Sequence, residues 1–178
     1  MLDPERRRQR HLDAAVGYLT LQMPDHALAE LRAVDDPDAD ARVFYQLRAE
    51  AYRMKRLHAE ALQDYERALQ EAPDDPTLML GMAWCYKRTG QLGKAIAITE
   101  AAYRIAPDKP LIMYNLACYL ALAGDRERAL AWLGRALRRD QSYRKLVAEE
   151  PDFDGLRADP DFRRIVGERF AGPIRHKE

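Results

Sequence analysis

Three columns of small residues recur every 34 positions along this chain of 178 residues. They are Ala15, Ala49, Ala83 and Ala117; Ala27, Ala61, Ala95 and Ala129; and Val34, Ala68, Ala102 and Ala136. Eleven of these twelve positions are alanine, whereas 28 alanines in 178 residues would place only about two there by chance. A fixed period of this length is typical of repeat proteins, in which each unit packs against the next. The alanines predict helices that approach closely, because only small side chains permit short distances between helix axes.

The residue content predicts that the repeats are helical. Alanine, leucine and arginine favour helices, whereas the residues Val, Ile and Thr, which favour strands, number only 15 together. Pro76 and Pro110, 34 residues apart, suit the first turn of a helix. Gly90 and Gly124, also 34 apart, fall where a left-handed helix C-cap is expected. We therefore expect an all-α chain of helix–turn–helix units.

One unit carries a recognisable pattern almost in full, as Tyr45-x-x-Arg48-Ala49-x-x-Tyr52 followed by Ala61-x-x-x-Tyr65. These residues resemble the tetratricopeptide repeat, a helix–turn–helix unit of 34 residues. Arg48 departs from the family pattern, as does Thr99 in the next unit. The resemblance implies an α-solenoid with a right-handed superhelix. We expect the array to occupy residues 1–143, with repeats at about 8–41, 42–75, 76–109 and 110–143.

Residues 144–178 break the period, and we expect them to form a helical cap with a frayed tail. Asp159 before Pro160 is typical of a helix start, with an N-cap followed by proline. The helix expected there carries an apolar stripe made of Phe162, Ile165, Val166, Arg169 and Phe170. We expect this stripe to pack against the last repeat, and the alternative is a docking helix for another molecule.

The sequence offers no arrangement of residues that catalysis or a cofactor requires. The four histidines form no HxxxH or HExxH pair, and the glycines form no phosphate-binding loop. Ser142 is the only serine, which leaves little material for serine-nucleophile chemistry. Cys85 and Cys118 form no CxxC motif and are expected to be buried thiols. We therefore expect no catalytic residue, no metal site, no cofactor and no enzymatic activity.

Charge and hydropathy limit the kinds of partner that the chain can bind. The 29 basic and 29 acidic side chains cancel, so no overall field attracts nucleic acid. The longest uncharged stretch, residues 110–124, is too short for a membrane span, which needs about 20 residues. The first residues contain no apolar segment of the signal-peptide type, and we expect a cytoplasmic protein.

The family resemblance implies where a protein partner would bind, because the first helix of each tetratricopeptide repeat lines a concave groove. The residues expected in this groove are Leu12, Val16, Glu50, Leu80, Trp84, Lys87, Arg88, Leu111, Tyr114 and Cys118. Trp84 and Tyr114 are the expected anchors, since aromatic side chains often dominate binding energy. Two alternatives remain open: Trp84 packs between helices, or the C-terminal segment folds over the groove.

The chemistry of the expected groove favours an apolar or amphipathic protein segment. Repeats that hold the acidic tails of Hsp70 and Hsp90 chaperones use a carboxylate clamp with basic residues, and the matching positions here supply no cation. These positions hold Leu12, Val16, Leu47, Thr77 and Gly81. We expect a non-catalytic adaptor for protein–protein interaction. The alternatives are a holding chaperone for secreted subunits, and a self-assembling scaffold that forms a homo-oligomer through the first repeat or Trp132.

Overall fold

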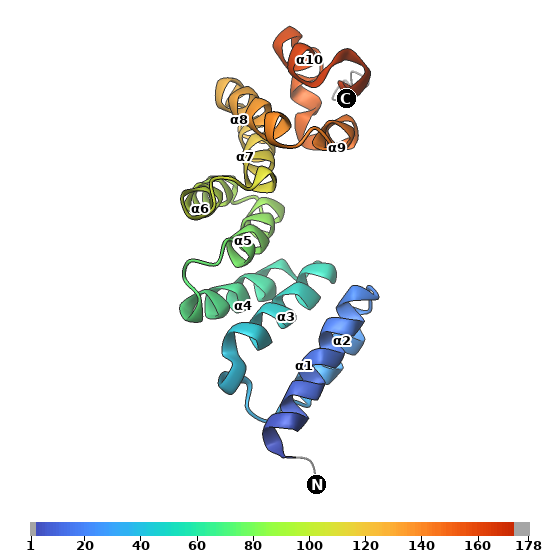
Figure 1. The fold of residues 1–178 in the computed structure, drawn as a ribbon, viewed down its shortest axis with the longest axis vertical. Coiled ribbons are helices and arrows are strands. Elements are labelled where there is room, and N and C mark those ends of the chain that lie inside the picture. Colours follow the sequence, from blue (N-terminus) through green and yellow to red (C-terminus); the bar gives the residue numbers. More distant parts are fainter. Residues whose placement is uncertain (1–2, 173–178) are drawn as a thin grey trace. The chain divides into compact units, whose positions relative to one another are not determined.

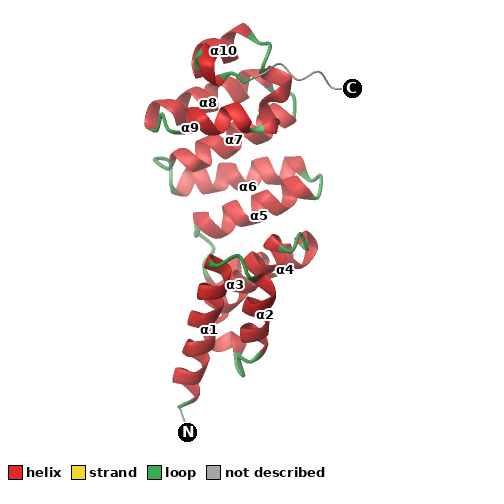
Figure 2. Ribbon diagram, turned by 90° about the vertical axis from the view of Figure 1, so that its right-hand side faces the viewer, coloured by secondary structure: helices red, strands yellow, loops and turns green. Residues whose placement is uncertain are grey.

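The computed structural model describes residues 3–172, which are built from helices and contain no strand (Figure 1; Figure 2). The α-helices are α1 (Pro4–Thr20), α2 (Pro24–Arg32), α3 (Ala41–Met54), α4 (His58–Glu71), α5 (Pro76–Arg88), α6 (Leu92–Ile105), α7 (Pro110–Leu122), α8 (Arg126–Arg139), α9 (Tyr143–Glu149) and α10 (Pro160–Val166). Three short 3-10 helices are η1 (Pro37–Asp40), η2 (Pro151–Leu156) and η3 (Glu168–Phe170). The prediction of an all-α fold is confirmed.

The chain divides into two compact units, residues 1–91 and residues 92–178. In the first unit α1 packs on α2, α3 packs on α4, and α3 also contacts α1 and α5. In the second unit α6 contacts α7 and α7 packs on α8, while η2 contacts α7 and α10 contacts α8. No helix in the described residues is long and apolar enough to cross a bilayer. The frayed tail expected at residues 173–178 lies outside the described residues.

The period of 34 reappears in the helix boundaries. The second helix of successive hairpins begins at residues 24, 58, 92 and 126, each 34 after the last. All eleven alanines of the three columns are fully buried, and Val34 is 7 % exposed. This burial is what close helix packing requires, since a larger side chain at those positions has no free space.

The turn inside each hairpin contains a second periodic feature. Gln22, Arg56, Gly90 and Gly124 all have positive φ angles, of 59°, 62°, 75° and 78°. The two glycines adopt the left-handed conformation that was expected of them. Gln22 and Arg56 adopt it at a cost of about 1–2 kcal/mol each, because their Cβ atoms crowd the backbone.

The one odd residue of the second repeat has a partner in the same hairpin. Arg48 on α3 donates two hydrogen bonds of 2.7 Å to Asp64 on α4, whose side chain is almost fully buried. The guanidinium also lies over the rings of Phe44 and Tyr45, at 5.0 and 5.2 Å. A bidentate pair thus takes the place of an apolar contact between the two helices.

The last α-helix of the C-terminal cap begins where the sequence predicted but ends earlier. Asp159 caps α10 as predicted, accepting hydrogen bonds from the backbone N–H groups of Asp161 and Phe162. The expected longer helix is wrong, because α10 ends at Gly167, where φ is 84°. Arg169 and Phe170 therefore lie on η3, and the apolar stripe is limited to α10. Within the stripe, Phe162 and Val166 are buried.

A fully buried arginine holds the cap together. Arg157 donates to the Asp154 carboxylate at 2.7 Å and to the carbonyl oxygens of Val147, Glu150 and Ala171 at 3.4, 2.9 and 2.6 Å. These carbonyls come from α9, the start of η2 and the residue after η3. One side chain therefore ties three segments of the cap to one another.

Candidate partner-binding site

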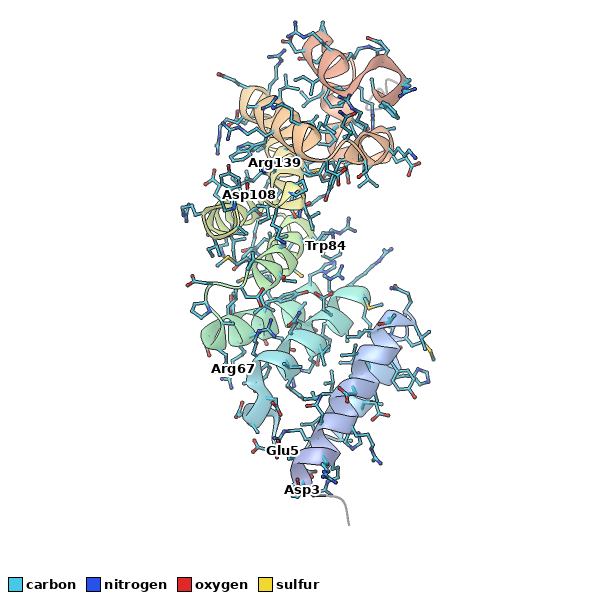
Figure 3. All side chains as sticks on the ribbon, in the orientation of Figure 1. Asp3, Glu5, Arg67, Trp84, Asp108 and Arg139 are labelled. Carbon is cyan, nitrogen blue, oxygen red and sulfur yellow. The ribbon has the colours of Figure 1, made fainter. Side chains whose placement is uncertain are left out.

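A hollow of about 600 Å³ opens beside Trp84 in the first unit. Figure 3 labels Trp84, which lies on α5. It is formed by the ends of α1 and α3, the turns that follow them, and α5. The residues around it are Leu19, Thr20, Gln22, Glu50, Arg53, Met54, Arg56 and Trp84. Since α1, α3 and α5 are the first helices of their hairpins, the hollow lies on the kind of helix that the sequence predicted to line a groove.

Trp84 is partly exposed and is surrounded by basic side chains. The guanidinium groups of Arg53 and Arg88 lie 5.2 and 5.6 Å from the centre of its ring. The His58 ring meets the indole edge to face, with 5.2 Å between the ring centres and 77° between the planes. These contacts orient the indole, because cations attract the face of an aromatic ring.

A hydrogen-bonded network supports the floor of the hollow. Arg53 donates to Glu50 at 2.6 and 2.9 Å, and the buried Tyr65 hydroxyl donates to the other oxygen of that carboxylate. Tyr65 reaches Glu50 because Gly81 on α5 has no side chain. A Cβ atom at residue 81 would lie 2.4 Å from the Tyr65 ring, well inside contact distance. Glycine at this position is therefore required by packing.

The hollow carries positive charge. Arg53, Arg56 and Arg88 contribute three cations, against the single carboxylate of Glu50. Burial, and then the charges of Arg88, Arg56 and Arg53, lower the pKa of His58 below its usual 6.5. The imidazole is therefore neutral at pH 7 and adds no further charge.

Within residues 3–172, the two non-glycine residues with a left-handed backbone both line this hollow. Gln22 and Arg56 occupy the turn positions at which the later hairpins have Gly90 and Gly124. Backbone strain of this kind persists where the side chain has a use that the strain-free glycine cannot serve. Arg56 places a guanidinium group at the edge of the hollow.

The structure separates the predicted groove residues of the first unit. Val16 on α1 is 46 % exposed, one turn before Thr20, whereas Leu12 is 2 % exposed. Leu12 belongs to the core with Ala15 and Ala27, so the expectation that it lines a groove is corrected. Leu80, Lys87 and Arg88 lie on the same helix as Trp84, Leu80 one turn before it and Lys87 and Arg88 within one turn after it.

In the second unit the cap covers two of the three predicted groove residues. Leu111 is 47 % exposed, but Tyr114 is 6 % and Cys118 3 % exposed. The Tyr114 ring lies 5.0 Å from that of Tyr143 and 6.0 Å from that of Phe153, both in the cap. Tyr114 and Cys118 are therefore packed against the C-terminal segment, one of the two alternatives that the sequence left open.

A second hollow of about 570 Å³ lies in this unit between α8 and α10. It is rich in arginine, and three of its arginines have polar partners in the same unit. Arg126 and Arg164 pair with Asp161, at 2.6 and 2.8 Å, and Arg144 donates to the carbonyl oxygen of Ile165. These pairs favour a role in fastening the cap, so the hollow beside Trp84 is the better candidate for a partner.

The sequence pattern did not identify four residues that line the Trp84 hollow, namely Leu19, Gln22, Arg53 and Arg56, or His58, whose ring contacts that of Trp84. Arg53 lies one turn after Glu50, while Arg56 and His58 lie in the turn and at the start of α4. The family pattern points to the first helix of each repeat and gives no weight to the turns. Arg56 did carry a signal, since it stands in the column that holds Gly90 and Gly124.

Comparison with known proteins agrees with this architecture. Residues 56–102 match the family model described as "Tetratricopeptide repeat". This segment of the chain is therefore similar to the tetratricopeptide repeat. No curated protein sequence shows significant similarity to it.

Solved structures of the same fold are distant in sequence. PilF of Pseudomonas aeruginosa is 13 % identical, with a TM-score of 0.76 over 98 % of this chain and 79 % of that one. MamA of Desulfovibrio magneticus is 17 % identical, with a TM-score of 0.69 over 79 % and 77 %. YrrB, described as a TPR protein with an unusual peptide-binding site, is 17 % identical, with a TM-score of 0.69 over 90 % and 82 %. At these identities the likeness shows the tetratricopeptide fold alone.

Proposed function

We propose that this tetratricopeptide repeat protein is a non-catalytic adaptor that binds a segment of another protein at the Trp84 hollow. The segment is amphipathic, with an apolar or aromatic side chain that enters the hollow and acidic residues beside it. The observation that carries the proposal is the partly exposed indole of Trp84 between Arg53 and Arg88, in a hollow of about 600 Å³.

The apolar part of the proposal rests on the shape and lining of the hollow. Leu19 and Met54 line the hollow together with Trp84 and provide apolar surface, and Val16 on α1 is an exposed apolar side chain one turn before Thr20. Methionine adapts its shape to different ligands, and aromatic residues supply the largest contact area. A buried anchor of this kind typically contributes most of the affinity of an interface.

The acidic part of the proposal rests on charge. With three arginines and one carboxylate at the hollow, an acidic flank on the segment would gain charge-assisted hydrogen bonds. Opposite charges also increase the rate of association and discriminate against basic segments. This refines the sequence expectation of an apolar or amphipathic ligand. YrrB is itself described as having an unusual peptide-binding site, so the fold is compatible with such a ligand.

The test is a peptide selection with the full chain, followed by affinity measurements on purified variants. Peptides are selected from a random displayed library, and their dissociation constants are measured by calorimetry. We expect Trp84→Ala to weaken binding by about 30-fold, the effect of removing a buried aromatic anchor. Trp132→Ala is the matched control, because Trp132 packs against Tyr103 in the second unit.

The outcomes separate the proposal from its alternatives. Equal affinity for Trp84→Ala and the unchanged protein would contradict binding at the hollow. A scaffold that self-assembles through Trp132 would instead lose its oligomers in sedimentation when that residue is replaced. A holding chaperone would solubilise an otherwise insoluble client when the two are co-expressed.

A further inference from the structure

Two hollows of the second unit share the same two arginines of α8. The larger hollow, of about 570 Å³, lies between α8 and α10, and its lining includes Arg135 and Arg138. The lining of the smaller hollow, of about 250 Å³, includes the same two arginines with Tyr103 of α6 and Met113 of α7. Arg135 and Arg138 form an arginine ridge, with one hollow toward α10 and the other toward α6 and α7.

The arginine ridge is exposed, and no carboxylate within residues 3–172 neutralises its charge. Arg135 lies over the Trp132 ring, 4.6 Å from its centre, and neither Arg135 nor Arg138 forms an ion pair with a described residue. Arg139, the next residue along α8, does have a partner, since it pairs with Asp108 at 2.7 Å (Figure 3). Residues three apart on a helix lie on the same face, so both cations of the ridge can contact one ligand.

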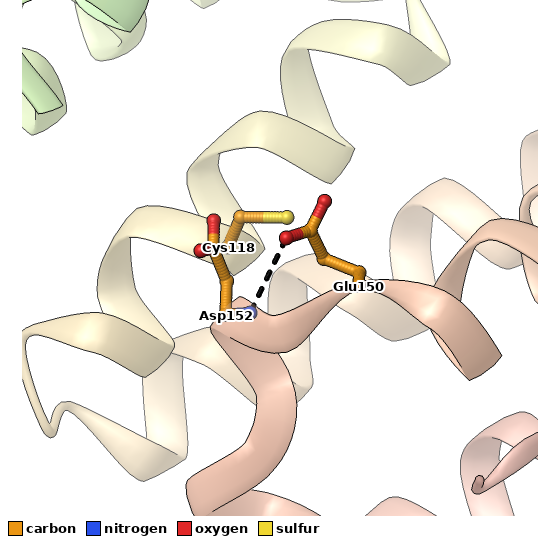
Figure 4. Close-up of side chains that lie close together, drawn as sticks. All are labelled: Cys118, Glu150 and Asp152. Carbon is orange, nitrogen blue, oxygen red and sulfur yellow. Dashed lines mark hydrogen bonds between the residues drawn. The ribbon is translucent and has the colours of Figure 1, made fainter. Parts of the chain in front are cut away.

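Acidic residues of the cap are engaged away from the ridge. Asp161 pairs with Arg126 at the start of α8, at 2.6 Å. Glu150 and Asp152 face Cys118 of α7 (Figure 4), and the Sγ atom and one oxygen of each carboxylate lie within 4.8 Å of one another. The contacts that join the cap to α7 and α8 thus leave the positive charge of the ridge available.

Both hollows offer apolar surface beside this charge. Leu130 and Ile165 line the larger hollow, and Tyr103 and Met113 line the smaller one. Aromatic and methionine side chains supply a large contact area that adapts to different ligands. We propose that this surface binds an acidic segment of another protein, with an apolar side chain in each hollow and carboxylates between them on the arginine ridge. Guanidinium groups form charge-assisted hydrogen bonds with carboxylates, so the ridge complements such a segment.

The charges beside the ridge favour a protein segment over a nucleic acid. Glu127 and Asp161 also line the larger hollow, where they would repel a strand that carries a phosphate at every nucleotide. A protein segment can place its carboxylates on the ridge and apolar side chains in the hollows, which avoids this repulsion. The surface shares no residue with the Trp84 hollow, so it would be a second binding surface of the adaptor.

The test uses the full chain and a synthetic peptide in which a phenylalanine and a leucine flank a run of glutamates, with a benzophenone crosslinker at one end. We expect illumination to attach the peptide to residues 126–144 or 160–166, which contain the lining of the larger hollow. Arg135→Gln and Arg138→Gln should each raise the dissociation constant by about fivefold, and together by about 20-fold, because each removes a charge-assisted contact.

The matched control is Arg104→Gln, which removes the same charge from the same unit. Arg104 is exposed and lines neither hollow, so the affinity for the peptide should not change. A second peptide, with serine in place of the phenylalanine and leucine, separates the hollows from the ridge and should bind about tenfold more weakly. Because the replaced arginines are all exposed, the variants should keep the Tm of the unchanged chain.

Each outcome distinguishes this surface from the Trp84 hollow. Equal affinity of the ridge variants and the unchanged chain would overturn the proposal, as would equal binding of the two peptides. Tighter binding of a single-stranded oligonucleotide that depends on the same arginines would overturn the assignment to a protein segment. Crosslinks confined to the Trp84 hollow would support the adaptor site there and overturn this one. Crosslinks to α8 that persist in Trp84→Ala would support this surface whatever the result at Trp84.

Discussion

Trp84 and Tyr114 occupy comparable places in sequence, on the first helices of adjacent hairpins, and differ in surroundings. Trp84 is partly exposed and is contacted by Arg53, Arg88 and the neutral His58. Tyr114 is 6 % exposed and is packed against aromatic rings of the cap. The comparison shows that a repeat pattern identifies the helix that carries an aromatic residue. Whether that residue stays accessible depends on segments outside the repeat.

Replacing Arg157, which holds together the C-terminal cap that packs on Tyr114, should give the largest loss of stability. Arg157→Met keeps the bulk of the side chain but leaves the Asp154 carboxylate and three carbonyl oxygens without their donor. We expect the free energy of unfolding to fall by about 3 kcal/mol, as when one partner of a buried ion pair is lost. Urea denaturation followed by circular dichroism measures this change.

The control for Arg157 is another arginine of the cap. The Arg164 side chain is 79 % exposed and pairs with Asp161 at the surface. Arg164→Met should change the free energy of unfolding by less than about 0.5 kcal/mol. Equal effects of the two replacements would show that the buried arginine does not hold the cap.

Replacing Gly81 should disturb the hydrogen-bonded network beneath the Trp84 hollow. Gly81→Ala places a Cβ atom against the Tyr65 ring, which must move and lose its hydrogen bond to Glu50. We expect a loss of about 2 kcal/mol from overpacking, measured by thermal unfolding. Gly17→Ala is the control, because residue 17 lies inside α1 with no neighbour within 4 Å. It should stabilise the chain by about 0.5–1 kcal/mol, and a stabilising Gly81→Ala would contradict the packing argument.

The contribution of the Arg56 charge to peptide binding at the Trp84 hollow can be separated from the effect of its backbone strain on stability. Arg56→Gly removes a left-handed non-glycine residue and should stabilise the chain by about 1 kcal/mol. The same change should weaken the binding of an acidic peptide, because the hollow loses a cation. Gln22→Gly relieves comparable strain at another lining residue without changing charge, so it should weaken binding of the acidic peptide less than Arg56→Gly does. If both variants bind equally well, charge at residue 56 has no part in recognition.

The smallest expected effect concerns pH and His58. Burial and neighbouring arginines lower the pKa of His58 in the folded chain, so the unfolded chain binds a proton more readily. The stabilisation that neutral His58 contributes is therefore fully present above pH 6.5, the pKa of His58 in the unfolded chain. It is lost as the pH falls through the lower pKa of His58 in the folded chain. Urea midpoints at about pH 7.5 and pH 5 should differ less for His58→Gln than for the unchanged chain. An identical difference would show that His58 does not titrate in this way.

The repeat could be predicted because its signal is distributed over many residues. Each column position obeys the same packing constraint, so the eleven alanines reinforce one another and all prove to be buried. The end of α10 was less predictable, because a single glycine at residue 167 outweighs the apolar residues that follow it. The candidate site was predicted only in part. Trp84 follows from the pattern of α5, but Arg56 and His58 come from a turn whose side chains the pattern does not describe.

The sequence by itself determined the helical repeat, its period of 34 and the small residues at which helices touch, because these depend on local propensity and on a constraint repeated along the chain. The tertiary structure decided which first-helix residues remain exposed. Leu12 is buried in the core, Tyr114 and Cys118 lie beneath the cap, and Trp84 stays at an open hollow. Exposure depends on contacts between segments far apart in sequence, and no period of 34 residues records where the last segment of the chain folds.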